Sequence, residues 1–117
     1  MGDKSIVGKK SKLFAIGAID LYRSILIPQN EYILSKQFLR SATSIGANIA
    51  EATGAYSKKE FSNKMSIAYK EARETSYWLE ILHESGYVEH KKFGELYYQL
   101  TEINKLLFSI LRTTHIK

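Results

Sequence analysis

SKKEFSNKMSIAYKEARETSYWLEILHESG, residues 57–86, carries the most regular hydrophobic pattern in the chain. It begins with a capping box, in which the Ser57 hydroxyl and the Glu60 carboxylate each accept a hydrogen bond from a free backbone N–H. Apolar and small residues then recur at alternating spacings of four and three as far as Gly86: Phe61, Met65, Ala68, Ala72, Thr75, Leu79 and Leu82. This pattern predicts one long helix that packs nearly parallel to its neighbours.

Three more segments show helical spacing, at residues 10–26, 30–53 and 89–112. Their stripe residues are Phe14, Gly17, Leu21, Ser24 and Ile25, then Leu34, Phe38, Ser41, Ile45, Asn48 and Ala52, and last Phe93, Leu96, Leu100, Ile103, Leu107 and Ile110. The first stripe is widened by Leu13, Ile16 and Ile19. Pro28 is expected to end the first helix, and Asn30 to cap the second.

Only a few residues connect these helices, so each must fold back beside the preceding one. We therefore predict an all-α fold, an antiparallel up-down-up-down four-helix bundle, in one domain at residues 10–114. Residues 1–9 are expected to form a flexible basic segment, and residues 115–117 a C-terminal tail. The chain has no cysteine and no apolar run long enough to span a membrane, which favours the cytoplasm.

Small residues fill the second half of the second helix, where residues 44–52 read SIGANIAEA. They leave a facing helix room to approach closely. Asn48 lies in this seam and is interpreted as a buried polar residue that sets the helix register.

Several carboxylates could suggest acid–base catalysis, but cations lie close to them in the predicted bundle. Glu71 and Glu74 flank Arg73, and Lys70 is four residues before Glu74. Structural ion pairing explains them more simply than catalysis does. We therefore predict no catalytic residue and assign an inter-helix structural role to Asn48, Glu51, Glu71, Arg73 and Glu74.

Glu80 and His83 have the Glu-x-x-His spacing that di-iron bundles use. Such sites need the motif twice, and neither His90 nor His115 has a glutamate three residues before it. The pair is expected to be solvated near a helix end, so the sequence predicts no metal and no cofactor.

The chain carries 17 Lys and Arg against 12 Asp and Glu, a net charge of +5. Such an excess favours a polyanionic partner, although it can also serve solubility alone. The basic residues are clustered: Lys9, Lys10 and Lys12 lead the first helix, Lys58, Lys59 and Lys64 open the third, Lys91 and Lys92 open the fourth, and Lys36 and Arg40 share one face of the second.

Large apolar residues exceed what one stripe per helix requires. The surplus consists of Ile67, Tyr69, Tyr77, Trp78 and Ile81 in the third segment, with Tyr22, Tyr32, Tyr97 and Tyr98 elsewhere. A surface of this kind often marks a subunit interface, and the alternative is deeper burial within a single bundle.

The runs at residues 39–52, 57–61, 70–75 and 77–79 together resemble one bacterial family. It is the four-helix-bundle family of 23S rRNA intervening-sequence proteins, also called S23 ribosomal protein-like, to which the accessory variability proteins of diversity-generating retroelements are similar. The resemblance implies a homo-oligomer, a barrel-like homopentamer by analogy, with a positively charged surface that binds nucleic acid. For the retroelement relatives it also implies a reverse transcriptase partner.

The sequence and the resemblance together predict a non-enzymatic bundle that binds RNA or DNA through phosphate contacts. The residues assigned to this contact are Lys36, Arg40, Lys58, Lys59 and Lys64. A protein–protein scaffold with no direct nucleic-acid role is the alternative, and a metal-dependent enzyme is a more distant one.

Overall fold

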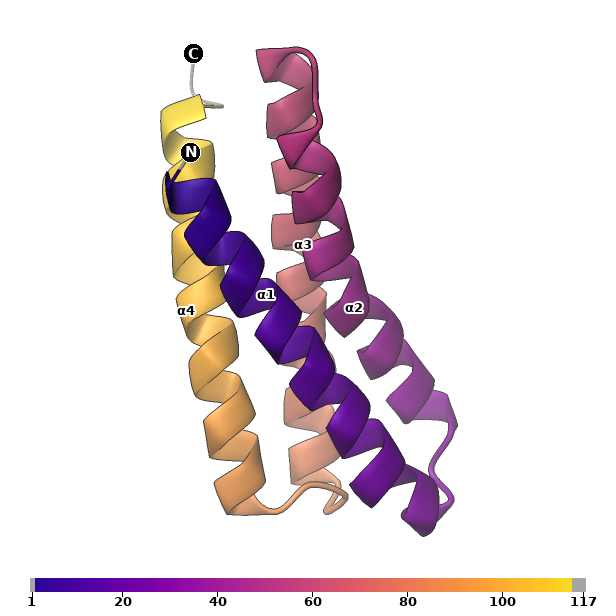
Figure 1. Cartoon of the computed structure of the whole chain (residues 1–117). Helices are drawn as coiled ribbons and strands as arrows, with labels where there is room; N and C mark the ends of the chain where they lie inside the picture. Colours follow the sequence, from indigo (N-terminus) through magenta and orange to yellow (C-terminus); the bar gives the residue numbers. More distant parts are fainter. Residues whose placement is uncertain (1, 115–117) are drawn as a thin grey trace.

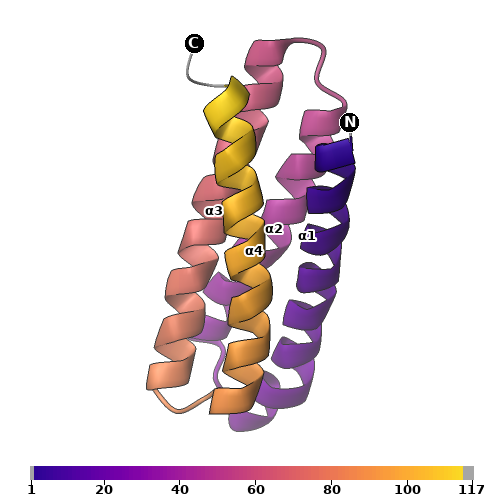
Figure 2. The ribbon, with the colours of Figure 1, turned by 90° about the vertical axis from the view of Figure 1, so that its left-hand side faces the viewer.

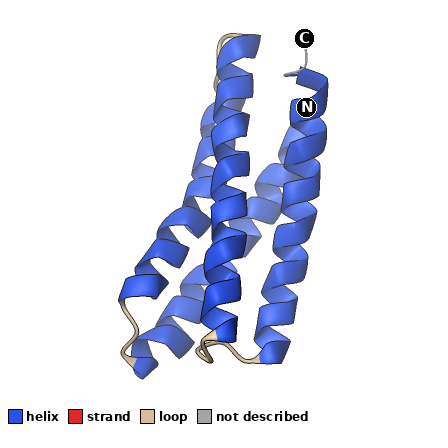
Figure 3. Ribbon diagram, turned by 180° about the vertical axis from the view of Figure 1, so that it is seen from behind, coloured by secondary structure: helices blue, strands red, loops and turns tan. Residues whose placement is uncertain are grey.

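Helix α3, Lys58–Glu84, is the longest of four α-helices in the computed structural model. The structure describes residues 2–114, with side chains from residue 6 onward. The other helices are α1 (Gly2–Leu21), α2 (Ile33–Thr53) and α4 (His90–Thr114). A π-helical turn, η1 (Tyr22–Leu26), and a short 3-10 turn, η2 (Ile27–Gln29), follow α1, and no strand occurs within residues 2–114 (Figure 3).

Both ends of α3 follow the predicted signals. The backbone N–H of Glu60 donates to Ser57 Oγ over 3.0 Å, which is the serine half of the capping box. After Glu84 the chain turns at Gly86, whose φ of 89° is readily adopted only by glycine. There the N–H of Gly86 donates to the carbonyl of His83, and that of Tyr87 to the carbonyl of Leu82.

The four helices form an antiparallel bundle measuring 45 × 20 × 20 Å. Each helix packs against its neighbours in sequence, α1 also packs against α4, and the backbones of the diagonal pairs lie farther apart. Figures 1 and 2 show the resulting up-down-up-down arrangement. One end of the bundle therefore collects the start of α1, the end of α2, the start of α3 and the end of α4.

The core contains most of the predicted stripe residues, and Phe14, Phe38, Met65 and Leu100 among them are fully buried. The widened stripe of the first helix was wrongly predicted. Leu13, Ile16 and Ile19 are exposed, Leu13 to 66%, whereas Val7, Phe14, Ala18 and Leu21 face the core. Helical spacing allows either face of such an apolar helix to turn inward, and the packing of α1 against both α2 and α4 selects one.

The predicted first boundary is also wrong. Helix α1 begins at Gly2 rather than at Lys10, so residues 2–9 belong to this helix. Val7 is fully buried, and a Cβ added to Gly8 would lie 3.8 Å from Ile49 Cγ2 of α2. Packing of Val7 and Gly8 against the bundle thus lengthens the helix. The predicted tail, residues 115–117, lies outside the described residues.

Small residues do allow α1 and α2 to approach closely, as predicted. A Cβ added to Gly46 would lie 3.6 Å from Ser11 Cβ.

The interpretation of Asn48 as a buried polar residue that sets the helix register is wrong. Asn48 is half-buried, and its amide donates to the carbonyl and hydroxyl of Ser44 in its own helix. The buried polar contact between helices lies one turn or more earlier, where Thr75 Oγ1 of α3 donates to Ser41 Oγ over 2.8 Å.

The start of α2 is capped by Glu31, not by the predicted Asn30. Asn30 adopts a left-handed conformation with φ of 60° after the turn that contains Pro28. The buried Glu31 carboxylate accepts hydrogen bonds from the backbone N–H groups of Leu34 and Ser35 and from the Ser35 hydroxyl. Burial by itself would raise the pKa of Glu31, but these hydrogen bonds outweigh it and lower the pKa.

Glu31→Gln is expected to lower the free energy of unfolding by about 1 kcal/mol at pH 7. The substitution removes the negative charge of the carboxylate that accepts hydrogen bonds at the start of α2. The folded pKa of Glu31 lies below its ordinary value of 4.5. The charge therefore contributes fully above pH 4.5, and its contribution is lost as the pH falls through the folded pKa. Urea titrations at pH 7 and pH 3 should show the difference between the two proteins shrinking in acid; an equal difference at both would contradict this role.

Candidate nucleic-acid interface

Lys58 and Lys59 occupy the first turn of α3. The Ser57 cap begins the helix one residue before them, which places both lysines at its N-terminus. Both are exposed, and neither has an ion-pair partner among the described side chains. The helix N-terminus adds its own positive potential, so these two ammonium groups are suited to bind an anion such as phosphate.

Further cations lie toward the same end of the bundle, which we call the basic end. The antiparallel order places the start of α1 and the end of α4 at the same end of the bundle as the start of α3 (Figure 1). The cations without an ion pair there are Lys9, Lys12, Lys58, Lys59, Lys105 and Arg112. Of the acids toward this end, Glu102 pairs with Lys10 and Glu51 pairs with Lys64, and Glu60 lies in the first turn of α3. The cations at this end outnumber these three acids. The net positive charge is therefore concentrated at this end.

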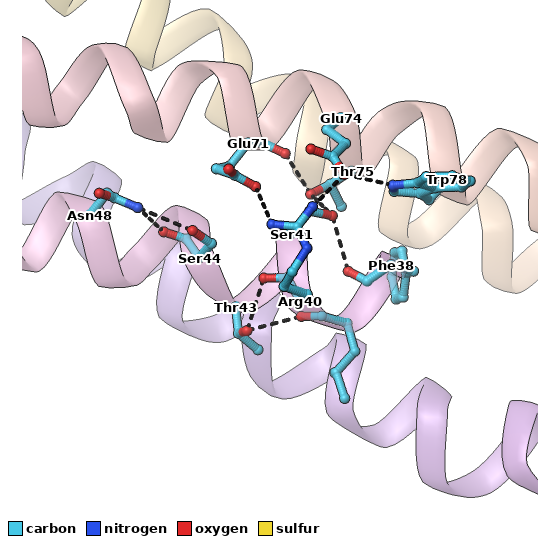
Figure 4. Close-up of polar contacts among 11 residues, drawn as sticks. Phe38, Arg40, Ser41, Thr43, Ser44, Asn48, Glu71, Glu74, Thr75 and Trp78 are labelled. Carbon is cyan, nitrogen blue, oxygen red and sulfur yellow. Dashed lines mark hydrogen bonds and ion pairs between the residues drawn. The ribbon is translucent and has the colours of Figure 1, made fainter. Parts of the chain in front are cut away.

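Arg40 is held in an ion-paired cluster. Its guanidinium binds Glu71 over 3.2 Å and also binds Glu74, both on α3. Figure 4 shows Arg40 reaching across from α2 toward these two carboxylates. The Trp78 indole N–H donates to Glu74 over 2.9 Å, and this bond, with those from Arg40, lowers the pKa of Glu74. The cluster supports the predicted structural role of both glutamates but leaves Arg40 little capacity for phosphate.

Lys64 is also held in an ion pair between α2 and α3. Its ammonium lies 2.7 Å from Glu51 of α2, and that hydrogen bond raises the pKa of Lys64. The contact agrees with the structural role predicted for Glu51. Lys36 is exposed but lies in the first turns of α2, near the opposite end of the bundle from Lys58. The fold therefore does not gather the five predicted cations into one patch.

Two predictions about α3 need correction. Arg73 is exposed and forms no ion pair among the described side chains, so it does not join the α2–α3 cluster. Glu80 and His83 are not a solvated pair. Glu80 accepts a 2.7 Å hydrogen bond from the Tyr97 hydroxyl of α4, which raises the pKa of Tyr97. The His83 ring stacks on Phe93, with ring centroids 4.2 Å apart.

The described residues contain neither a metal site nor a membrane-spanning helix. Among the side chains of residues 6–114, no three from His, Asp or Glu gather closely enough to hold a metal ion. No helix in the described part of the chain has both the length and the apolar character needed to cross a membrane.

Residues 3–109 match the family described as 23S rRNA-intervening sequence protein. The chain belongs to this family. It is also similar to a protein with unknown function from the S23 ribosomal protein family of Bacteroides thetaiotaomicron VPI-5482, whose crystal structure matches with a TM-score of 0.91. The two are 46% identical, and the match covers 94% of this chain and 98% of that chain. No curated protein matches this chain.

Membership of the 23S rRNA-intervening sequence protein family confirms the resemblance and the bundle fold. Neither the family description nor that of the Bacteroides structure indicates an enzyme.

The sequence did not single out Lys105 and Arg112 as members of the basic end. They lie far from Lys58 in the chain and have no clustered neighbours, so no local pattern reveals them. Lys9 and Lys12 did carry a signal, because they belong to the lysine-rich run that leads the first helix, but they were not assigned to the phosphate contact.

Proposed function

We propose that this chain is a cytoplasmic, non-enzymatic protein that forms a homo-oligomer and binds the phosphate backbone of RNA or DNA. The observation that carries the proposal is the basic end, where exposed lysines of α1 and α3 lack carboxylate partners among the described side chains. Solvated ammonium groups at one end of a bundle supply the sequence-independent attraction on which phosphate binding depends.

Oligomerisation is supported by the outer face of α1. Ile6, Leu13 and Ile16 are all exposed along it, and such a row of apolar side chains favours contact with another protein surface. Some of the aromatic surplus that the sequence assigned to an interface, Tyr69, Trp78 and Tyr97 among it, packs instead against the core. A closed ring, with five subunits by family resemblance, would repeat the basic end and multiply a modest affinity per subunit.

Replacing Lys58 and Lys59 together by glutamine is expected to weaken binding to RNA and DNA about tenfold or more at low salt. The slope of log affinity against log salt should fall by about two, because each phosphate contact contributes about one to it. The measurement is a fluorescence-anisotropy titration of wild type and variant at two salt concentrations.

The matched control replaces Lys91 and Lys92 by glutamine. These residues also open a helix, α4, but they lie at the opposite end of the bundle, and Lys92 there forms an ion pair with Glu95. This control should retain the wild-type affinity and slope. Wild-type protein that binds neither RNA nor DNA at low salt, or binds without salt dependence, would refute the proposal. Native mass measurement tests the oligomer separately, and a monomer at micromolar concentration would contradict that part.

The exposed apolar face of α1 also fits the second candidate, a protein–protein scaffold. Partner capture that survives nuclease treatment and high salt, together with no direct nucleic-acid binding, would favour the scaffold.

A further inference from the structure

A groove of about 480 Å³ lies between α3 and α4. It extends from the middle of α4 toward the basic end, and its lining includes Tyr69, Asn104, Lys105, Phe108 and Arg112. We call it the aromatic groove. A second hollow of about 270 Å³ shares Ser76 and Tyr97 with it and adds Arg73 and Tyr77, so the two hollows form one continuous surface.

Aromatic rings are available at the surface of this groove. Phe108 is 53% exposed, although it lies on a helix whose other large apolar residues mostly face the core. Tyr69 lies beside it with ring centroids 6.2 Å apart. The Arg112 guanidinium carbon lies 5.9 Å from the centre of the Phe108 ring. A ring with a neighbouring guanidinium is the arrangement on which unpaired bases stack in single-strand-binding proteins.

The charges of the groove complement a phosphate chain. Lys105 and Arg112 line the main hollow and Arg73 lines its extension, and none of the three forms an ion pair among the described side chains. Glu80 is the one carboxylate in the lining of either hollow, and it is occupied by the Tyr97 hydroxyl. Three cations without carboxylate partners complement the negative charge of a polyanion, whereas an uncharged protein surface would leave them unpaired.

The groove also contains a polar atom without a protein partner. Asn104 Oδ1 is buried and accepts no hydrogen bond within the described chain, while the Asn104 amide nitrogen donates to Leu100 and Ser76. Less than 1 Å² of this oxygen is exposed, so a base bound in the groove would contact Phe108 and the cations rather than Asn104.

We propose that the aromatic groove binds a single-stranded segment of RNA or DNA, with a base stacked on Phe108 and phosphates at Lys105 and Arg112. This inference rests on the proposed nucleic-acid binding and deepens it, because it adds a preference for unpaired bases. The basic end attracts any phosphate backbone, whereas a ring in a groove contacts bases only where they are free of a duplex.

The test compares a 12-nucleotide single strand with a 12-base-pair duplex by anisotropy, in RNA and in DNA form, at one salt concentration. Phe108→Ala should weaken single-strand binding about 5-fold to 100-fold and leave duplex binding unchanged. Phe108→Trp, which keeps an aromatic face, should retain single-strand binding. The matched control is Tyr98→Ala, because Tyr98 is on the same helix and 68% exposed but lies outside both hollows. Ultraviolet crosslinking of the single strand should map to Phe108 or Tyr69 in wild type.

Three results would overturn the inference. Equal affinities of wild type and Phe108→Ala for the single strand would do so. A Phe108→Ala variant with an altered native mass and unaltered binding would identify the groove as a subunit interface. Equal losses of affinity for the single strand and the duplex would show that the groove is a general phosphate site without a preference for unpaired bases. If Lys58→Gln/Lys59→Gln weakens binding in any of these cases, the proposed function stands without the groove. Wild-type protein that binds no nucleic acid would refute both.

Discussion

Replacing Phe14 by alanine is expected to lower the free energy of unfolding by about 3–5 kcal/mol. Phe14 lies in the middle of α1, is fully buried and is among the largest side chains in the core. Truncation removes the ring from a region that the surrounding helices cannot fully refill, so a cavity adds to the lost apolar burial. A chain of this size has a total stability of about 5–15 kcal/mol, so the loss would be a large share.

The control for Phe14→Ala is Phe108→Ala, the same chemical change on α4. Because Phe108 is 53% exposed and lies beside Tyr69 and Arg112 at the surface, its replacement should lower the free energy of unfolding by only about 1 kcal/mol. Urea denaturation followed by circular dichroism measures both. Similar losses for the two variants would contradict the assignment of Phe14 to the core and Phe108 to the surface.

The second large effect is expected from adding volume in the core. Ala72 is fully buried near the middle of α3, and its side chain is a single methyl group. Ala72→Leu introduces three more carbon atoms and should lower the free energy of unfolding by about 2–3 kcal/mol, because the helices must separate or adopt strained rotamers. Alanine here is needed for its size, since leucine is as good a helix former in context.

Ala47→Leu serves as the control for added volume. Ala47 belongs to the small-residue run of α2, but it is exposed, so the larger side chain extends into solvent. Its free energy of unfolding should change by less than about 0.5 kcal/mol. Urea denaturation followed by circular dichroism measures both variants. An Ala72→Leu variant as stable as wild type, together with a destabilised Ala47→Leu variant, would contradict the burial of Ala72 and the exposure of Ala47.

Much of the fold could be predicted from local pattern. The stripe from Met65 to Leu82, the Ser57 cap and the stop at Gly86 all have short-range physical causes, and all appear in the structure. These predictions succeed because helical periodicity and capping depend on residues within one or two turns.

The predictions that failed depended on neighbours far away in the chain. Leu13 and Phe14 are both large and apolar, and only the positions of α2 and α4 determine which of them is buried. Glu31 replaces Asn30 as the cap because the turn around Pro28 places Asn30 in a left-handed conformation. Val7 extends α1 through a contact surface that the local sequence does not reveal.

The candidate site divides in the same way. Lys58 and Lys59 could be predicted because their place at a helix N-terminus follows from the four residues of the capping box. Arg40 and Lys64 looked equally available in the sequence, yet the structure pairs them with Glu71, Glu74 and Glu51. Whether a cation is free depends on which carboxylate the neighbouring helix brings within reach.

The sequence by itself therefore determined four helices, their order, most of their inward faces and the positive charge of the chain. Only the tertiary structure decided which apolar residues of α1 face outward, which cations remain unpaired and which of them gather at the basic end. The physical reason is the distance along the chain between the residues that interact. Helix formation and capping are governed by contacts a few residues apart, whereas burial and ion pairing depend on residues that the antiparallel packing brings together from distant parts of the chain.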